Sequence, residues 1–256
     1  MPVGVLSGYD PMGELDIARE AEEMAAIGSM LRKRWQEGGF HAVVSINVPH
    51  EPFELRGLPL SIEEKDRARR FRQVMNCNRS VMSWIVLRSI VGAMLDTRPE
   101  NVTVVRALAG KPSVQPGPGI SISHAGDLAV VAFSSEMDIG VDVETIEQDD
   151  ALLLTVMGTL SPRELACLST DRMAKSEFLL RAWTRKEAAV KVAGSGLSVD
   201  LTKVSVAEQE GCRFQCHLPG AEIITGTDLH LGSGYIAALA SKTFINDVAQ
   251  YHIRHF

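Results

Sequence analysis

Residues 139–144 read Ile-Gly-Val-Asp-Val-Glu, and the interpretation of the fold depends on this stretch. Apolar residues alternate with Gly140, Asp142 and Glu144, which is the period of a β-strand with one buried face. Asp142 and Glu144 therefore share a face, where two carboxylates repel each other unless a positive charge lies between them. Two interpretations stay open: a strand end that faces water, or a site for a hard cation such as Mg²⁺, which prefers carboxylate oxygens.

A second stretch follows about 40 residues later, with Trp-Thr-Arg-Lys-Glu-Ala-Ala-Val-Lys at positions 183–191. It lies in a helix that we expect over 175–192, ended by Gly194. Trp183, Glu187 and Lys191 are spaced four residues apart, so they lie on one helix face. Taken alone, this spacing is more typical of an ordinary Glu–Lys pair on a solvated face than of a functional site.

The sequence on either side predicts a chain of mixed helices and strands. A helix, a strand, a turn region and an apolar strand recur just over 100 residues apart. We therefore predict an α+β, pseudo-duplicated two-lobe fold, with a small antiparallel sheet and a long helix in each lobe and the active site between the lobes. The expected divisions are an N-terminal helical extension (1–40), a first lobe (41–137) and a second lobe (138–256). Helices are expected over 13–36, 61–75, 79–95 and 175–192, and strands over 42–48, 102–108, 120–123, 128–133 and 139–143 and near 204, 214, 227 and 236.

Composition and charge exclude several classes of protein. The chain has 256 residues, of which 45% are apolar and 23% charged, which is typical of a globular protein. The longest apolar stretch, 81–95, is interrupted by Arg88 and is shorter than the ~20 residues of a membrane helix. The first 25 residues are acidic, unlike a secretory signal, and predict a cytoplasmic protein. The four cysteines lack zinc-finger spacing and are interpreted as reduced thiols.

The net charge of −6 argues against a general nucleic-acid binder, but the charge is segregated along the chain. Residues 65–88 hold seven bases and one acid, whereas 1–64 and 89–256 each carry a net charge of −6. A basic segment of this kind is expected to attract an anionic partner.

Two further segments carry polar side chains. Ile-Ser-Ile-Ser-His-Ala-Gly at 120–126 predicts a half-buried strand that ends in a tight turn near His124, and Gly110-Lys111-Pro112 predicts a turn. Each is more often structural than functional when met alone. The sequence has neither a phosphate-binding P-loop nor a G-x-G-x-x-G pattern, so a standard nucleotide-binding fold is not indicated.

Taken together and in this order, these segments resemble the 4′-phosphopantetheinyl transferase superfamily, in its two-lobed form. The signature is the strand with Asp142 and Glu144 followed by the helix with Trp183, Glu187 and Lys191. The resemblance extends to the Gly110-Lys111-Pro112 turn, the Ser123-His124 pair, the Ser161–Glu164 capping box and Gly194–Leu197, and it covers about residues 42–240.

The resemblance implies a reaction and its participants. Members of the family transfer the 4′-phosphopantetheine arm of coenzyme A to a serine of an acyl or peptidyl carrier protein, with Mg²⁺, and release adenosine 3′,5′-bisphosphate. The carrier is expected to be acidic, and the enzyme is expected to be a monomer. The resemblance does not identify the carrier or its pathway.

The resemblance also implies roles for individual residues. Asp142, Glu144 and Glu187 would hold Mg²⁺, and Glu187, directly or through a water, would act as the base on the carrier serine. Lys191 would reach the pyrophosphate. The expected coenzyme A contacts are Arg67, Arg79, Lys111, Ser123, His124, Asp142 and Lys191.

Some residues depart from the family pattern, and other functions stay open. Glu64 occupies a position where relatives often have a lysine, and Glu164 fits either a helix cap or a further carboxylate of the site. Residues 1–40 have no counterpart, and they are expected either to pack on the first lobe or to form an acidic arm that shields the basic segment. The alternatives to a transferase are an inactive coenzyme A- or carrier-binding module and a magnesium-dependent phosphohydrolase.

Overall fold

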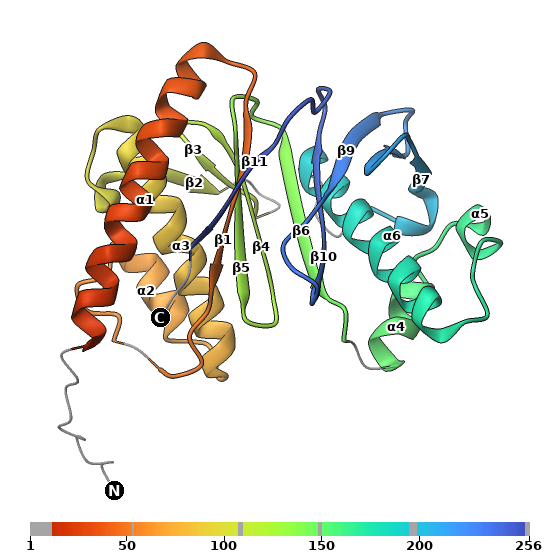
Figure 1. The fold of residues 1–256 in the computed structure, drawn as a ribbon, viewed down its shortest axis with the longest axis horizontal. Coiled ribbons are helices and arrows are strands. Elements are labelled where there is room, and N and C mark those ends of the chain that lie inside the picture. Colours follow the sequence, from red (N-terminus) through yellow and green to blue (C-terminus); the bar gives the residue numbers. More distant parts are fainter. Residues whose placement is uncertain (1–11, 53, 107–109, 148–149, 195–198, 254–256) are drawn as a thin grey trace, which may run out of the picture.

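The alternating stretch around Asp142 forms strand β6 (Ile139–Thr145), and Glu187 lies in the long helix α6 (Arg172–Ala193) (Figure 1). The structure is a computed structural model and describes residues 12–52, 54–106, 110–147, 150–194 and 199–253. Helix α6 begins at Asp171, whose side chain accepts the N–H of Ala174, and ends at Gly194 with a φ of 67°. Both are common helix ends, because Asp satisfies a free amide and glycine tolerates a positive φ.

The first lobe contains two long helices and a four-stranded sheet. Its sheet has the order β11-β1-β5-β4, with β1 parallel to β11 and antiparallel to β5. A separate hairpin pairs β2 with β3. The elements are α1 (Met12–Glu37), β1 (His41–Asn47), α2 (Ile62–Ala68), α3 (Val74–Leu95), η1 (Pro99–Asn101), β2 (Val104–Arg106), β3 (Pro112–Val114), β4 (Gly119–Ala125), β5 (Leu128–Ser134) and β11 (Ala249–Ile253).

The second lobe packs α6 against a five-stranded antiparallel sheet of order β6-β10-β9-β8-β7. Its remaining elements are α4 (Asp150–Met157), α5 (Pro162–Leu165), η3 (Leu201–Lys203), β7 (Ser205–Glu208), β8 (Arg213–His217), β9 (Ile223–Leu229) and β10 (Tyr235–Ser241).

The predicted duplication is visible in the order of elements. In each lobe, a strand precedes a short capped helix and a long helix, and a 3₁₀ turn and four strands follow. β1, α3 and η1 in the first lobe therefore correspond to β6, α6 and η3 in the second. The α+β two-lobe fold is confirmed.

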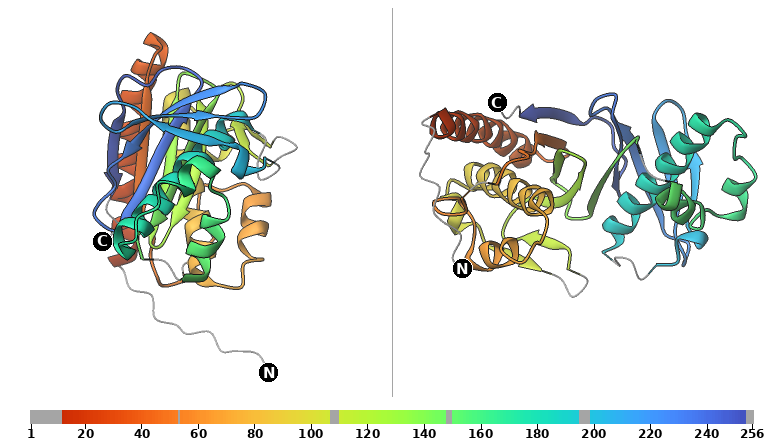
Figure 2. Two further views of the ribbon diagram at one scale, coloured as in Figure 1. Left: turned by 90° about the vertical axis from the view of Figure 1, so that its right-hand side faces the viewer. Right: turned by 90° about the horizontal axis from the view of Figure 1, so that it is seen from below.

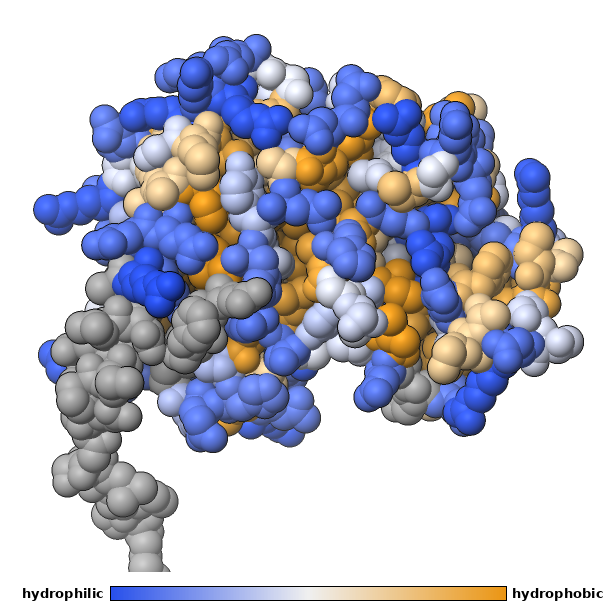
Figure 3. Space-filling view, in the orientation of Figure 1, coloured by the Kyte–Doolittle hydropathy of each residue, from blue (hydrophilic) through white to orange (hydrophobic). Residues whose placement is uncertain are grey.

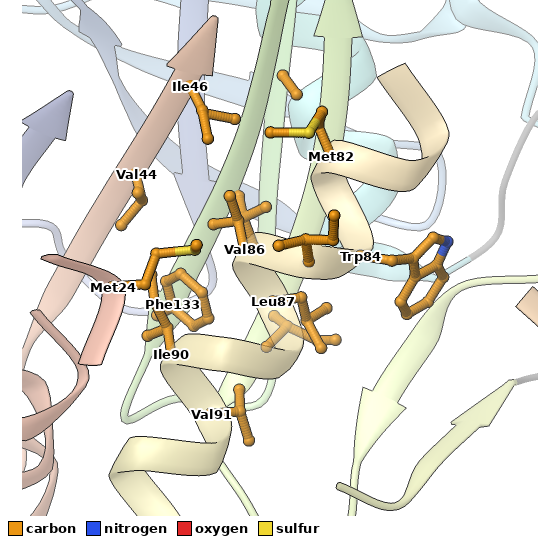
Figure 4. Close-up of a cluster of buried hydrophobic side chains, with 14 of the residues drawn as sticks. Met24, Val44, Ile46, Met82, Trp84, Val86, Leu87, Ile90, Val91 and Phe133 are labelled. Atoms are coloured by element: carbon orange, nitrogen blue, oxygen red, sulfur yellow. The ribbon is translucent and has the colours of Figure 1, made fainter. Parts of the chain in front are cut away.

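The core of the first lobe lies between its helices and its sheet. Helix α1 packs on α3 and touches β11, α3 covers strands β1 and β5, and Met24, Ile90 and Phe133 meet in this core (Figure 4). The helices approach closely at Gly28, where a Cβ atom would lie 2.6 Å from both Ala93 Cβ and the Ile90 carbonyl oxygen. The described part of the extension, helix α1, thus packs on the first lobe, which was one of the two arrangements predicted from the sequence. Within the described residues its ion pairs include Arg32 with Asp96 and Arg34 with Asp247.

Several element boundaries differ from the sequence predictions. The helix expected over 61–75 ends at Ala68, and α3 begins five residues earlier than expected, because the chain turns between them. Pro112, the last residue of the turn expected over 110–112, begins strand β3, and neither β3 nor α4 was predicted. β11, assigned by sequence to the second lobe, joins the first sheet, so that sheet is mixed and not purely antiparallel. Residues 107–108 of the expected strand 102–108, and 195–197 of the glycine segment, lie outside the described residues.

The two sheets lie side by side in the middle of the molecule, with helices on the outer flanks (Figure 2). A common apolar cluster joins them, formed from β1, β4 and β5 on one side and β6, β9 and β10 on the other. Seen from the side of Figure 1, hydrophilic residues cover most of the surface, and hydrophobic ones show in the band between the lobes (Figure 3). Among the described helices, none combines the length and apolar character that crossing a membrane requires.

Candidate functional site

The seam between the lobes runs along β4 and β6, which belong to different sheets. Side chains bridge these strands: Ser121 Oγ accepts the N–H of Val141 at 3.0 Å, and Ser123 Oγ accepts that of Val143 at 3.4 Å. The serines of β4 thus have a structural role, because their hydroxyl groups accept backbone N–H groups of the neighbouring strand. Residues two apart in a strand share a face, so the isoleucines point to the other face.

Asp142 is buried at this seam. Its Oδ1 accepts hydrogen bonds from Ser123 Oγ at 2.9 Å and from Lys191 Nζ at 2.8 Å, and the same ammonium donates to the Val141 carbonyl at 2.8 Å. The second oxygen, Oδ2, is buried without a hydrogen-bond partner. Because an unsatisfied buried carboxylate oxygen is costly, this atom indicates a further ligand.

Glu144 and Glu187 join Asp142 in a cluster of three carboxyl side chains from β6 and α6, which is called the carboxyl group below. Trp183 Nε1–H donates to Glu144 Oε1 at 3.0 Å, while Glu187 Oε1 is buried without a partner. Burial, and then the nearby charge of Asp142, raise the pKa of Glu144 to about 7. The same two causes, in the same order, raise the pKa of Glu187. Charge repulsion of this kind is relieved when a cation binds between the carboxylates.

Gly140 allows α6 to approach β6 closely enough to bring these groups together. A Cβ atom at this position would lie 2.0 Å from the Ala188 carbonyl oxygen and 3.0 Å from Lys191 Cβ. Glycine is therefore required between the apolar residues of the strand, because any other side chain would push the helix away.

The donor set fits a hard divalent cation. Two carboxylate oxygens lack partners, two carboxyls have raised pKa values, and oxygen ligands suit Mg²⁺. As they stand, the described side chains include no cluster of three His, Cys, Asp or Glu residues arranged to hold a metal ion. In this arrangement Lys191 and Trp183 bind Asp142 and Glu144 respectively.

A cavity of about 310 Å³ opens beside the carboxyl group. Four of the residues predicted to contact coenzyme A line it: Arg67, Lys111, His124 and Lys191. The structure does not place the other three, Ser123, Arg79 and Asp142, in this lining. Ser123 binds Asp142, and Arg79 donates to the Gly126 carbonyl and, at 3.0 Å, to Asn76 Oδ1. The other lining residues are Phe71, Ser80, Ser83, Trp84, Arg106, Pro112, Ser121, Ile122 and Gly194.

The cavity is electrostatically prepared for an anion. Burial lowers the pKa of Lys111, and the neighbouring lysines Lys242 and Lys191 lower it further, against the opposing effect of Asp138. Its Nζ donates to the Ile139 carbonyl at 3.0 Å. His124 is reached by solvent but lies in a concavity, and desolvation by the surrounding protein lowers its pKa. Crowded cations gain most from an anionic ligand, which favours phosphate binding here.

The cavity wall also contains Arg106 and Trp84, which were not predicted from the sequence to belong to the site. The Arg106 guanidinium lies over the Trp84 ring, 4.9 Å from its centroid, and its pKa is lowered by burial and by the charge of Arg67. In Figure 4 the Trp84 indole points away from the apolar cluster of the first lobe. One signal was available: Trp84 lies one helical turn after Ser80, and both line the cavity.

Two other carboxylates are structural. Both oxygens of Glu64 accept hydrogen bonds from Arg88, at 2.7 and 3.0 Å, and the residue does not line the cavity. Glu164 caps α5 and pairs with Lys186, which is fully buried, at 2.6 Å. Of the two interpretations of Glu164, the structure favours the helix cap.

The expected free thiols are confirmed for all four cysteines. Cys216 is buried, Cys77 is half-buried, and Cys167 and Cys212 are exposed, and none forms a disulfide.

Comparison with known proteins agrees with this arrangement. A model described as the 4′-phosphopantetheinyl transferase superfamily matches residues 138–240, and one described as 4′-phosphopantetheinyl transferase, N-terminal, matches residues 49–136. The two matches meet between β5 and β6, where the chain passes from the first lobe to the second, and together they reach from α2 into β10.

Curated relatives carry the same description. The 4′-phosphopantetheinyl transferase AcpT of Salmonella typhi is 30% identical over 139 residues, which are 52% of this chain and 71% of AcpT. HetI of a Nostoc strain is 28% identical over 67% of this chain and 76% of its own length. Sfp of Bacillus subtilis is 25% identical over 62% of this chain and 71% of its own length. With its carboxyl group, its cationic cavity and these matches, the chain belongs to the 4′-phosphopantetheinyl transferase superfamily.

Proposed function

We propose that this protein transfers the 4′-phosphopantetheine group of coenzyme A to a serine of an acyl or peptidyl carrier protein, with release of adenosine 3′,5′-bisphosphate. One observation carries the proposal: three carboxyl side chains from β6 and α6, two with unpartnered buried oxygens, adjoin a cavity lined by four cationic or imidazole side chains predicted to bind coenzyme A. Anionic substrate and divalent cation thus have adjacent sites.

In this proposal the cavity residues bind the nucleotide and its phosphates. Arg67 contacts the 3′-phosphate side of coenzyme A, and Lys111 and His124 hold the nucleotide end. Lys191, at the border between cavity and carboxyls, contacts the pyrophosphate. These four side chains orient the substrate, and the positive charges of Arg67, Lys111 and Lys191 offset the negative charge of the phosphate oxygens.

The carboxyl group would hold Mg²⁺ through Asp142, Glu144 and Glu187. When bound, the metal supplies charge neutralisation at the pyrophosphate and stabilises the leaving group. Glu187, directly or through a water, accepts the proton of the carrier serine hydroxyl. The hydroxyl oxygen attacks the β-phosphorus, and the bond to the leaving nucleotide breaks.

We also propose a monomer acting in a reducing compartment, the cytoplasm. All candidate site residues come from one chain, so no second copy is needed to complete the site, and four free thiols suit reducing conditions. Light scattering coupled to size exclusion tests the monomer: a dimer mass would contradict it.

The experiment that tests the transferase uses coenzyme A, Mg²⁺ and a panel of apo-carrier proteins, with each carrier weighed by mass spectrometry. We expect at least one carrier to gain about 340 Da, the mass of the phosphopantetheinyl group. If coenzyme A binds but no carrier gains mass, the protein is a binding module. Release of phosphate-containing products without any carrier would favour a phosphohydrolase.

A further inference from the structure

The turn between β4 and β5 carries a candidate binding residue to the border between the lobes. His124 lies near the end of β4, and Gly126 and Asp127 form the turn, with Gly126 at a φ of 54°. His124 belongs to the first lobe, whereas Lys191, on the same cavity, belongs to the second. The distance between these two side chains therefore depends on the contacts of Ser123 across the seam and on how the turn is held against the second lobe.

Three elements hold this turn. Arg79 of α3 donates from Nε to the Gly126 carbonyl, and the Val48 N–H, just after β1, donates to the Asp127 carbonyl at 2.7 Å. The third contact crosses between the lobes: the Tyr235 hydroxyl of β10 donates to Asp127 Oδ1.

The crossing contact lies beside the carboxyl group. Tyr235 is the partner of Thr145 in the β6–β10 ladder, one residue beyond Glu144. The lobes are also in close contact here, since a Cβ atom on Gly126 would lie 2.7 Å from Thr145 Cγ2 and 3.3 Å from the Tyr235 hydroxyl. The contact therefore connects the end of the metal-ligand strand to the turn that follows His124.

The Tyr235 hydroxyl keeps its proton at every pH at which the protein would work. Desolvation, and then the hydrogen bond and charge of Asp127, raise the pKa of Tyr235 to about 12. A protonated phenol next to a carboxylate is a stable donor, so the contact persists across neutral pH.

We propose that Tyr235 and Asp127 form an inter-lobe bond that sets the position of His124 relative to Lys191 and so determines the affinity for coenzyme A. This inference rests on the proposed function. Both are positioning residues: neither lines the cavity, and they act through the turn. Their role explains why the β4–β5 turn is fixed by three separate elements.

The test compares Tyr235→Phe and Asp127→Ala, singly and together, with Tyr251→Phe as the matched control. Tyr251 lies on β11, at the opposite edge of the first sheet from β4. Calorimetry gives the Kd of coenzyme A, and carrier modification gives KM and kcat. We expect Tyr235→Phe to raise Kd and KM about two- to tenfold, as for loss of one hydrogen bond, with kcat little changed. The Kd of the double variant should be no higher than that of the single variant that binds coenzyme A less tightly.

Other outcomes overturn the proposal. An unchanged Kd in Tyr235→Phe while the wild type transfers normally would refute the positioning role and leave the transferase intact. Additive effects in the double variant would show that the two residues do not act as a pair. Equal effects of Tyr251→Phe would indicate a general loss of stability, which a thermal melt would show directly. A wild type that does not bind coenzyme A would refute this proposal and the proposed function together.

Discussion

Glu64 and Arg88 form a buried ion pair that connects two helices of the first lobe, with Arg88 donating from Nε and Nη2 to the two carboxylate oxygens. Glu64 also accepts the N–H of Ser61 in the capping box of α2, and Arg88 Nη1 donates to the carbonyls of Pro99 and Val102. The pair thus holds the start of α2 and the segment that follows α3.

The second lobe repeats this arrangement with different side chains. Glu164 accepts the N–H of Ser161 in the capping box of α5, and Lys186 of α6 donates to Glu164, Thr159 and Leu201. Lys186 stands in the stretch that suggests catalysis in the sequence, yet it is completely buried and its donors are all used within the protein. Each repeat thus contains a buried ion pair between a capping-box glutamate and a cation of the long helix.

Removing the cation of either pair should lower the free energy of unfolding of the protein. Arg88→Ala or Lys186→Ala leaves a buried carboxylate without its partner, which costs about 3–5 kcal/mol of unfolding free energy. Urea denaturation measures it. The control is Arg69→Ala, whose pair with Asp66 is exposed and contributes about 0–1 kcal/mol. Near-equal midpoints for Arg88→Ala and Arg69→Ala would show that the buried pair is not structural.

Replacing Glu187 with glutamine should abolish transfer and preserve the fold. Burial raises the pKa of Glu187, so the site disfavours charge there more than water does and should tolerate an uncharged isostere. Glutamine, however, cannot accept the serine proton and is a poor magnesium ligand. Mass spectrometry of the carrier and a thermal melt give the two readouts. Turnover near that of the wild type would mean that Glu187 is neither base nor metal ligand.

Arg106→Gln should weaken coenzyme A binding mainly through its phosphates. Arg106 lies over Trp84 on the cavity wall, close enough to Arg67 for the two positive charges to repel each other. Its loss removes one charge-assisted contact with the substrate and should raise the KM for coenzyme A about tenfold. Comparing coenzyme A with 3′-dephospho-coenzyme A locates the contact. If Arg106 binds the 3′-phosphate, the variant no longer prefers coenzyme A. An equal rise for both substrates would assign Arg106 to another phosphate, and no rise would exclude it from the site.

Buried His41 should make the protein less stable in mild acid. Its Nδ1 lies 3.0 Å from Ser134 Oγ, and burial lowers its pKa below the usual value of 6.5, although Glu136 opposes this effect. Because the folded pKa lies below the unfolded one, the stabilisation is present above pH 6.5 and is lost as pH falls through the folded pKa. Urea unfolding at pH 7.5 and 5.5 measures this loss.

The comparison uses His41→Asn, in which the amide replaces Nδ1 without titrating, and His230→Asn on the surface as control. We expect His41→Asn to lose part of the acid sensitivity and His230→Asn to keep it. If both variants respond to acid as the wild type does, His41 does not carry the effect.

Local periodicity predicted the elements that carry the carboxyl group. A period of two placed Asp142 and Glu144 on one strand face, and a period of four placed Trp183, Glu187 and Lys191 on one helix face, because both patterns depend only on neighbours in the chain. The capping boxes also fixed the starts of α2 and α5.

Contacts between segments far apart in the sequence could not be predicted from local periodicity. Arg106 reaches Trp84 only because the hairpin β2–β3 lies near α3, and the Tyr235–Asp127 contact joins residues 108 positions apart. The end of α2 at Ala68 has no glycine or proline to announce it, since the fold and not the local sequence requires the turn before Val74.

The return of β11 to the first sheet connects the end of the second half of the duplication to the first half through strand pairing. β11 lies beyond the residues that the family models match, and it completes the edge of a sheet whose other strands were made some 115 residues earlier. A chain cut between the lobes would leave β1 with an open edge, a surface on which strands of other molecules pair and aggregate. Because β1 has its outer partner only when β11 is in place, we expect the two repeats to unfold as a single cooperative unit.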